Sequence, residues 1–181
     1  MQKILVFFLL MAVVIPALAV NCSGKTITVV PFVNSSGNHS LDYLSDAIVN
    51  MLTTDLKQST KITVVTREDL DKILAENNLS RSELADPQNA QKLGKLLGAD
   101  VIIAGSFISI GNEMRFDSHA LDVSTGEVLS GQKITGNNND VMAMVDQLSS
   151  AVIHDLTGEK ISVASNTNHV KGNKTEGGTV R

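Results

Sequence analysis

Residues 97–134 constrain the fold most strongly, because they predict three consecutive strands joined by two tight turns. The first of these strands, residues 101–110, is apolar on both faces, which is typical of a central strand covered on each side. Turn chemistry follows at Gly111 and Asn112 and again at residues 124–127, where Gly126 can adopt positive φ. We therefore expect an antiparallel meander whose third strand covers residues 128–134.

The middle strand of this meander has two chemically different faces. Met114, Phe116 and Ala120 alternate on the apolar face, and Arg115, Asp117 and His119 alternate on the polar face. The phase changes near Ala120, since Leu121 and Val123 continue on the polar side, and this shift predicts a bulge or a strong twist. The polar face is either a small interaction patch or an ordinary solvated sheet surface.

Strand and helix patterns alternate on both sides of the meander. Strands are expected at residues 26–33 and 61–66, and helices at residues 40–56, after Thr66, at residues 87–97 and from residue 141. The order β-α-β-α-α-β-β-β-α predicts an α/β fold, a single compact domain with a mixed five-stranded sheet and helices packed on it. No internal repeat is visible.

Capping residues mark the boundaries of these helices. Ser40 and Thr66 are expected N-caps, and Asp69 stands near the capping-box position that follows Thr66. Asp86 followed by Pro87 is a clean helix start, and Gly98 suits a left-handed C-cap.

The N-terminus resembles an export signal. Residues 1–19 combine a positive Lys3, an apolar run and an A-x-A pattern that ends at Ala19, which together predict a secretory signal peptide. We expect a short linker at residues 20–25, the folded domain at residues 26–158 and a disordered tail at residues 159–181. A membrane anchor is disfavoured because the apolar run is short and contains Pro16.

Cys22 has two interpretations. It is the only cysteine, so it cannot close an internal disulfide. It is either the lipidated first residue of a mature lipoprotein or a free thiol near the N-terminus, and Asn21 fits a lipidation signal poorly. Contact with a membrane would therefore depend on a lipid anchor, and one acyl chain alone binds membranes only marginally.

Composition and motif searches argue against several function classes. The net charge of −4 and the aromatic content of 3% disfavour nucleic-acid binding, which uses basic surfaces and stacking rings. No phosphate-binding glycine motif and no nucleophile elbow occurs, and no histidine has a second ligand at metal spacing. We therefore predict no catalytic residue, no cofactor and no metal site, and the protein is not expected to be an enzyme.

Four short motifs carry a resemblance to a known family. Leu97-Gly98-Ala99-Asp100 with the strand that follows, and Leu121-Asp122-Val123-Ser124-Thr125-Gly126-Glu127-Val128-Leu129, are similar to the central strand and hairpin of the CsgG/FlgO/TolB-like N-terminal domain superfamily. Val30-Pro31-Phe32 and Val65-Thr66-Arg67-Glu68-Asp69-Leu70 resemble its first strand end and second helix start. The resemblance covers residues 26–157, and LpoB-type lipoproteins are related members.

The resemblance implies an exported, periplasmic or outer-membrane-associated protein that assists envelope assembly or secretion by binding other envelope proteins. Residues 110–113 and 136–140 are too short to supply the membrane hairpins of the curli channel, since a membrane strand needs about nine residues. The edge strand near Lys133 and Thr135, and the polar patch of Arg115, Asp117 and His119, are the expected binding surfaces, with a homo-oligomer as one outcome. An LpoB-like activator of a peptidoglycan synthase is the alternative, and a small-ligand or metal enzyme is least favoured.

Overall fold

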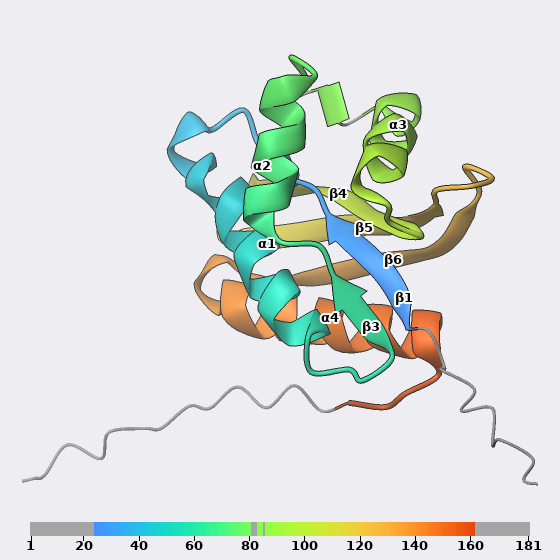
Figure 1. Ribbon diagram of the computed structural model, residues 1–181. Helices are drawn as coiled ribbons and strands as arrows, with labels where there is room; N and C mark the ends of the chain where they lie inside the picture. Colours follow the sequence, from blue (N-terminus) through green and yellow to red (C-terminus); the bar gives the residue numbers. More distant parts are fainter. Residues whose placement is uncertain (1–23, 81–82, 85, 162–181) are drawn as a thin grey trace, which may run out of the picture.

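The predicted meander forms one half of a mixed sheet in the computed structural model, which describes residues 24–80, 83–84 and 86–161 (Figure 1). The strands are β1 (Lys25–Val29), β2 (Val33–Asn34), β3 (Ile62–Val64), β4 (Val101–Ile110), β5 (Glu113–Asp122) and β6 (Val128–Asn137). Their order is β3-β1-β4-β5-β6, and β2 pairs with β4. β1 runs parallel to β3 and β4, whereas β4, β5 and β6 are antiparallel.

This architecture confirms the predicted α/β class and element order, and differs from the prediction in one strand. The sheet has six strands instead of five. The segment expected as one strand is divided, because Pro31 follows β1 and cannot donate to a ladder, and β2 then resumes pairing with β4 at Val33. The predicted signal peptide, Cys22 and residues 162–181 lie outside the described residues.

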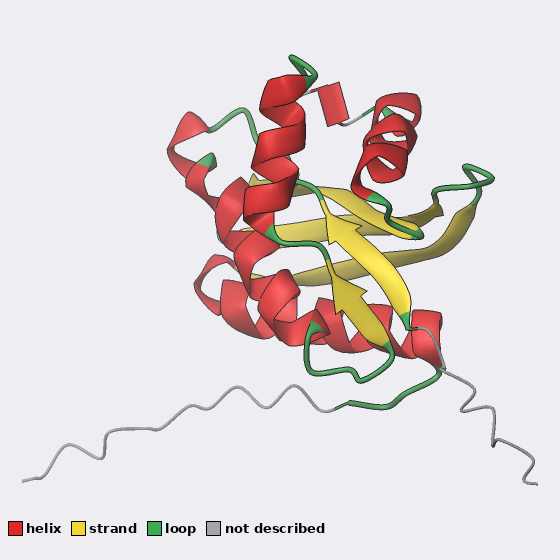
Figure 2. Cartoon of the chain, viewed as in Figure 1, coloured by secondary structure: helices red, strands yellow, loops and turns green. Residues whose placement is uncertain are grey.

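Helices cover both sides of the sheet, so the domain has three layers (Figure 2). The helices are α1 (Tyr43–Leu56), α2 (Arg67–Glu76), α3 (Pro87–Leu97) and α4 (Val141–Thr157), with short 3₁₀ turns η1 (His39–Leu41) and η3 (Asn138–Asp140). α1 and α4 pack on one face, and α2 and α3 on the other. None of the helices in the described part of the chain is long and apolar enough to cross a bilayer.

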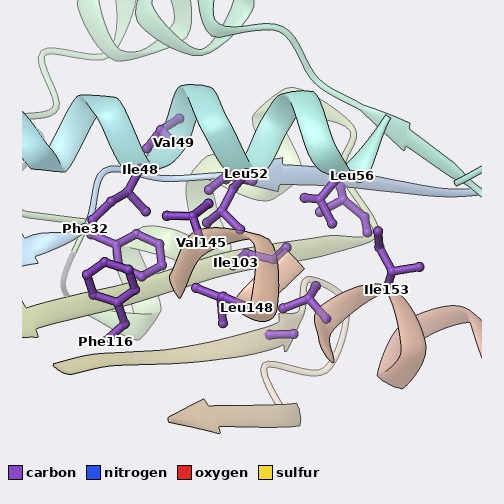
Figure 3. Close-up of a cluster of buried hydrophobic side chains, with 14 of the residues drawn as sticks. Phe32, Ile48, Val49, Leu52, Leu56, Ile103, Phe116, Val145, Leu148 and Ile153 are labelled. Atoms are coloured by element: carbon purple, nitrogen blue, oxygen red, sulfur yellow. The ribbon is translucent and has the colours of Figure 1, made fainter. Parts of the chain in front are cut away.

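The larger core lies between the sheet and the α1–α4 layer. Figure 3 shows Ile48 and Leu52 of α1 and Leu148 of α4 meeting side chains that rise from the strands. Phe32 and Phe116 are each at most 1% exposed there. A fully buried side chain of this size stabilises the fold by about 2 kcal/mol, so this layer supplies much of the stabilisation. A second cluster under α2 and α3 includes Leu70, Leu93 and Ile102.

Three of the four predicted caps are confirmed. The Thr66 hydroxyl accepts from the Asp69 amide, the Asp86 carboxylate accepts from the amides of Gln88 and Asn89, and Gly98 is left-handed with φ of 63°. The fourth prediction is wrong, because Ser40 lies inside η1. Asn38 caps that turn by accepting from the Ser40 amide, and α1 begins only after Asp42.

The predicted irregularity in the meander is confirmed at the expected place. The pairing of β5 with β6 shifts register between Ala120 and Leu121. β6 continues beyond the predicted end at residue 134 to Asn137, because the backbone N–H of Asn138 donates to the Asn112 carbonyl and keeps the hairpin paired.

Candidate functional site

The α2–α3 layer leaves the outer half of its sheet face uncovered. It packs on Ile102 and Ala104 in β4, but Arg115 of β5 and Lys133 and Thr135 of β6 are exposed. Directly paired residues project to the same side of a sheet, and Ala104 pairs with His119 while Asp117 pairs with Lys133. We call this surface the open face, defined by the side chains of Arg115, Asp117, His119, Lys133 and Thr135.

A pocket of about 520 Å³ lies where the open face meets the α2–α3 layer. Its wall includes Pro31, Val33 and Leu84, and its floor crosses β4, β5 and β6 from Ala104 and Ser106 to Gly131. Asp117, His119 and Lys133 also line it. The pocket is therefore apolar at its inner end and polar toward the sheet edge, and its volume is typical of sites for small molecules or single side chains.

Arg115 and Asp117 form a fixed ion pair at the rim of the open face. Arg115 Nε donates to both carboxylate oxygens of Asp117, at 3.0 and 2.8 Å, and Nη2 also donates to Oδ1. These hydrogen bonds raise the pKa of the Arg115 guanidinium above its ordinary value. Both side chains are nearly half exposed, so the pair contributes little to stability and serves chiefly to orient the two groups.

His119 lies deeper than the ion pair and is partly buried beside the pocket. Burial lowers the pKa of its imidazole below the ordinary value of 6.5, because desolvation disfavours the charged form. The ring is therefore neutral at pH 7 and offers one donor and one acceptor nitrogen.

Lys133 supplies the unneutralised positive charge of the open face. It stands opposite Asp117 in the register, but that carboxylate is held by Arg115. Lys133 forms no ion pair with any other described residue. The open face thus combines a neutralised pair, a neutral imidazole and one available ammonium group.

The structure therefore brings Arg115, Asp117 and His119 to one surface, as the alternation of β5 predicted. Sequence reasoning missed the contribution of Gly131 and the apolar wall. Gly131 lies beside His119 because of the pairing register of β5 and β6, which the sequence does not show, and Pro31 and Leu84 reach the pocket through tertiary packing. A glycine inside a strand pattern was the one available signal, because it often marks a close approach.

The Asp155 carboxylate of α4 has a structural role outside the open face. His154 approaches Asp155 at 3.6 Å, but Asp155 accepts from Ser130 and Gln132 of β6 and so ties α4 to the sheet. Within residues 24–80, 83–84 and 86–161, no group of three potential metal-ligating side chains occurs.

Comparisons with known proteins agree with the fold. A family model for the "curli production assembly/transport component CsgG" matches residues 11–119. The LpoB C-terminal domain from Salmonella enterica aligns with a TM-score of 0.54 at 18% identity, covering 64% of this chain and 84% of that domain. Lipoprotein GNA1162 from Neisseria meningitidis aligns at 0.55 and 16%, covering 76% of this chain and 99% of that protein. At these identities, structural likeness shows the fold alone.

One curated relative is named as an enzyme and not as an envelope protein. The chain is 24% identical over 131 residues to "Putative adenylate cyclase 3" of Rhizobium meliloti (strain 1021). The match covers 72% of this chain but only 21% of that protein, so the chain spans about a fifth of its length. The name of that longer protein therefore carries no activity over to this chain.

Proposed function

This chain belongs to the family of the curli production assembly/transport component CsgG, and from that membership we propose that it is a non-enzymatic accessory protein of the cell envelope. It assists assembly or secretion by binding other envelope proteins through the open face. The observation that carries this proposal is the partly apolar pocket beside an uncovered polar sheet surface and a free sheet edge. Such a surface suits recognition by shape and hydrogen bonds.

The proposed location is the periplasm or the outer membrane. It rests on the export signal expected at residues 1–19, and a lipid anchor in the outer membrane would require that Cys22 is lipidated. Cell fractionation tests export, and mass spectrometry of the mature N-terminus tests lipidation. An unmodified N-terminus at Val20 would contradict lipidation of Cys22. A chain found in the cytosol with its leader intact would contradict the proposed location.

In this proposal, the protein has no membrane channel of its own. β4 and β5 are joined by Gly111 and Asn112, and β6 and α4 are joined by η3 (Asn138–Asp140). These connections are shorter than the roughly nine residues that one membrane strand requires. The protein therefore acts next to an envelope machine and does not form its pore.

Photo-crosslinking in cells tests the binding surface directly. A photoreactive amino acid replaces Thr135 on the open face, and the matched control replaces Gln58, an exposed residue after α1 on the opposite helical layer. We expect an adduct with an envelope protein from position 135 and none from position 58. Equal adducts, or none, would contradict the proposal.

The partner in the adduct also separates the proposed function from its alternative. Secretion or appendage components support the assembly role. A peptidoglycan synthase would favour the LpoB-like activator instead, for which the likeness to the LpoB C-terminal domain provides fold support only.

A further inference from the structure

The long edge of the sheet is formed by β6, and nothing in the described chain pairs with its outer side. The opposite edge is β3, which has only three residues. β6 has ten residues, and the register shift near Leu121 affects only its first part. A regular, exposed edge of this length is a template for one more strand.

The hydrogen-bond pattern identifies which backbone groups of β6 are free. The Asn138 N–H donates to the Asn112 carbonyl, so the neighbouring pair Glu113 and Asn137 is a non-hydrogen-bonded pair. Alternation along the antiparallel ladder then directs the N–H and C=O groups of Gly131, Lys133 and Thr135 away from β5. These three residues offer a row of donors and acceptors to an added strand.

The same three residues lie along the border between the open face and the sheet edge, and at Gly131 the pocket is open toward that edge. Gly131 pairs with His119 and has no side chain, and a Cβ placed on it would meet only the Ser118 carbonyl oxygen at 3.9 Å. A side chain from an added strand can therefore extend over Gly131 into the mouth of the pocket. Lys133, two residues along, lies on the same face and has no ion-pair partner among the described residues.

The occupant of this edge is better matched by another protein segment than by a second copy. If two β6 strands paired antiparallel about Lys133, their ammonium groups would face each other, and like charges opposite each other destabilise a sheet. In any other register Lys133 would meet no carboxylate, because β6 contains no acidic residue. A segment with a carboxylate at that position gains an ion pair instead. Charge complementarity therefore selects an acidic partner strand.

We propose that β6 binds an extended segment of a partner protein as an added strand, with an acidic side chain beside Lys133 and an apolar side chain two residues away in the pocket over Gly131. This inference rests on the proposed function and names the kind of partner that its surface takes. The recognition motif is an acidic and an apolar residue separated by one position, in either chain direction. Backbone pairing gives affinity and the pocket gives specificity.

The test uses short random peptides displayed on phage and selected against the full chain. The enriched peptides are synthesised, and their affinities are measured by fluorescence anisotropy. We expect enrichment of the acidic-x-apolar spacing, or its reverse, over a bare matrix. Absence of enrichment, or enriched peptides without this spacing, would overturn the inference.

Three variants separate strand addition from other contacts. Thr135→Pro removes an outward N–H without breaking the ladder to β5, and we expect it to weaken binding about tenfold, whereas Thr135→Val keeps the N–H and retains binding. Lys133→Glu should lower the affinity for acidic peptides by at least about fivefold and raise the affinity for basic peptides. Gly131→Leu fills the mouth of the pocket and should also abolish selection for the apolar residue. Circular dichroism checks that each variant folds.

Amide hydrogen exchange provides a readout that does not depend on substitution. On peptide binding, the amides of Gly131, Lys133 and Thr135 should become protected. Protection elsewhere, or affinity unchanged in Thr135→Pro, would overturn strand addition. If position 135 still crosslinks an envelope protein in that case, the proposed function stands without this inference, and if it does not, both fail.

Discussion

The hydroxyl of Ser149 in α4 lies 2.6 Å from Oδ2 of Asp55 in α1, inside the interface between the two helices. Asp55 is 9% exposed and Ser149 is fully buried. The same hydroxyl also lies 2.8 Å from the Val145 carbonyl. This contact therefore places a buried polar link in a layer that is otherwise held mainly by apolar packing.

Replacing Ser149 by Ala should destabilise the domain by about 2 kcal/mol, because it leaves the Asp55 carboxyl group buried without its partner. Urea unfolding followed by circular dichroism measures the change. Ser150→Ala is the matched control, since the Ser150 hydroxyl contacts only the Asp146 carbonyl one turn back and its loss should cost under about 0.5 kcal/mol. Equal effects of the two substitutions would contradict a special role for the Ser149 contact.

Replacing Ser118 by Ala should change the stability in the opposite direction and stabilise the domain. The Ser118 hydroxyl is buried and has no hydrogen-bond partner among the described residues. Removing an unsatisfied hydroxyl recovers its desolvation cost, so we expect stabilisation of up to about 1 kcal/mol. A higher midpoint of thermal unfolding confirms this result, and a lower one shows that the hydroxyl is satisfied in solution.

Two strand glycines should respond differently to the same substitution. A Cβ on Gly105 would lie 2.5 Å from both the Asp117 carbonyl oxygen and Cε1 of Phe32, so Gly105→Ala should cost about 3 kcal/mol. Gly131→Ala meets no close atom and should change stability by less than about 1 kcal/mol. Denaturant midpoints compare the two. Similar losses in both variants would mean that strand flexibility, and not the contact with Phe32, decides the outcome.

Asp155 should make the attachment of α4 to β6 sensitive to acid. Hydrogen bonds from Ser130 and then Gln132 lower the pKa of Asp155 below its ordinary value of 3.8. A lowered pKa contributes stability that is present above pH 3.8 and is lost as the pH falls through the folded-state value. Asp155→Asn should therefore cost about 1 kcal/mol at pH 7, discounted for partial exposure, and progressively less below pH 3.8. A difference that does not depend on pH would contradict this account.

Local chemistry explains which parts of the fold could be predicted. Thr66 and Asp86 were identifiable as caps because each side chain acts on amides only two or three residues away. The predicted Ser40 cap was wrong because Asn38, two residues earlier, caps a 3₁₀ turn by accepting from the Ser40 amide, and this places Ser40 inside the turn. The split between β1 and β2 depends on how Val33 pairs with Ser106, which is a contact distant in sequence.

The candidate site was predictable only as far as one strand allows. Alternation places Arg115, Asp117 and His119 together, but it does not say whether a helix covers them. The pocket depends on Leu84 and Pro31 approaching from other segments and on the register that brings Gly131 beside His119. Such features arise from tertiary packing, so sequence patterns alone do not reveal them.

His119 provides a direct test of the environment of the open face. Burial lowers the pKa of His119, and Asp117, Arg115 and Lys133 are the charged groups on the same face. The folded-state pKa of His119 lies below the unfolded value of 6.5. As the pH falls below 6.5, the unfolded chain therefore binds more protons than the folded chain, and the free energy of unfolding decreases. NMR titration of the imidazole should give a midpoint below 6.5, with the urea-unfolded chain as the control. In His119→Gln, the free energy of unfolding should depend less on pH in this range. An NMR midpoint at or above that of the unfolded control would instead show that the neighbouring carboxylate outweighs burial.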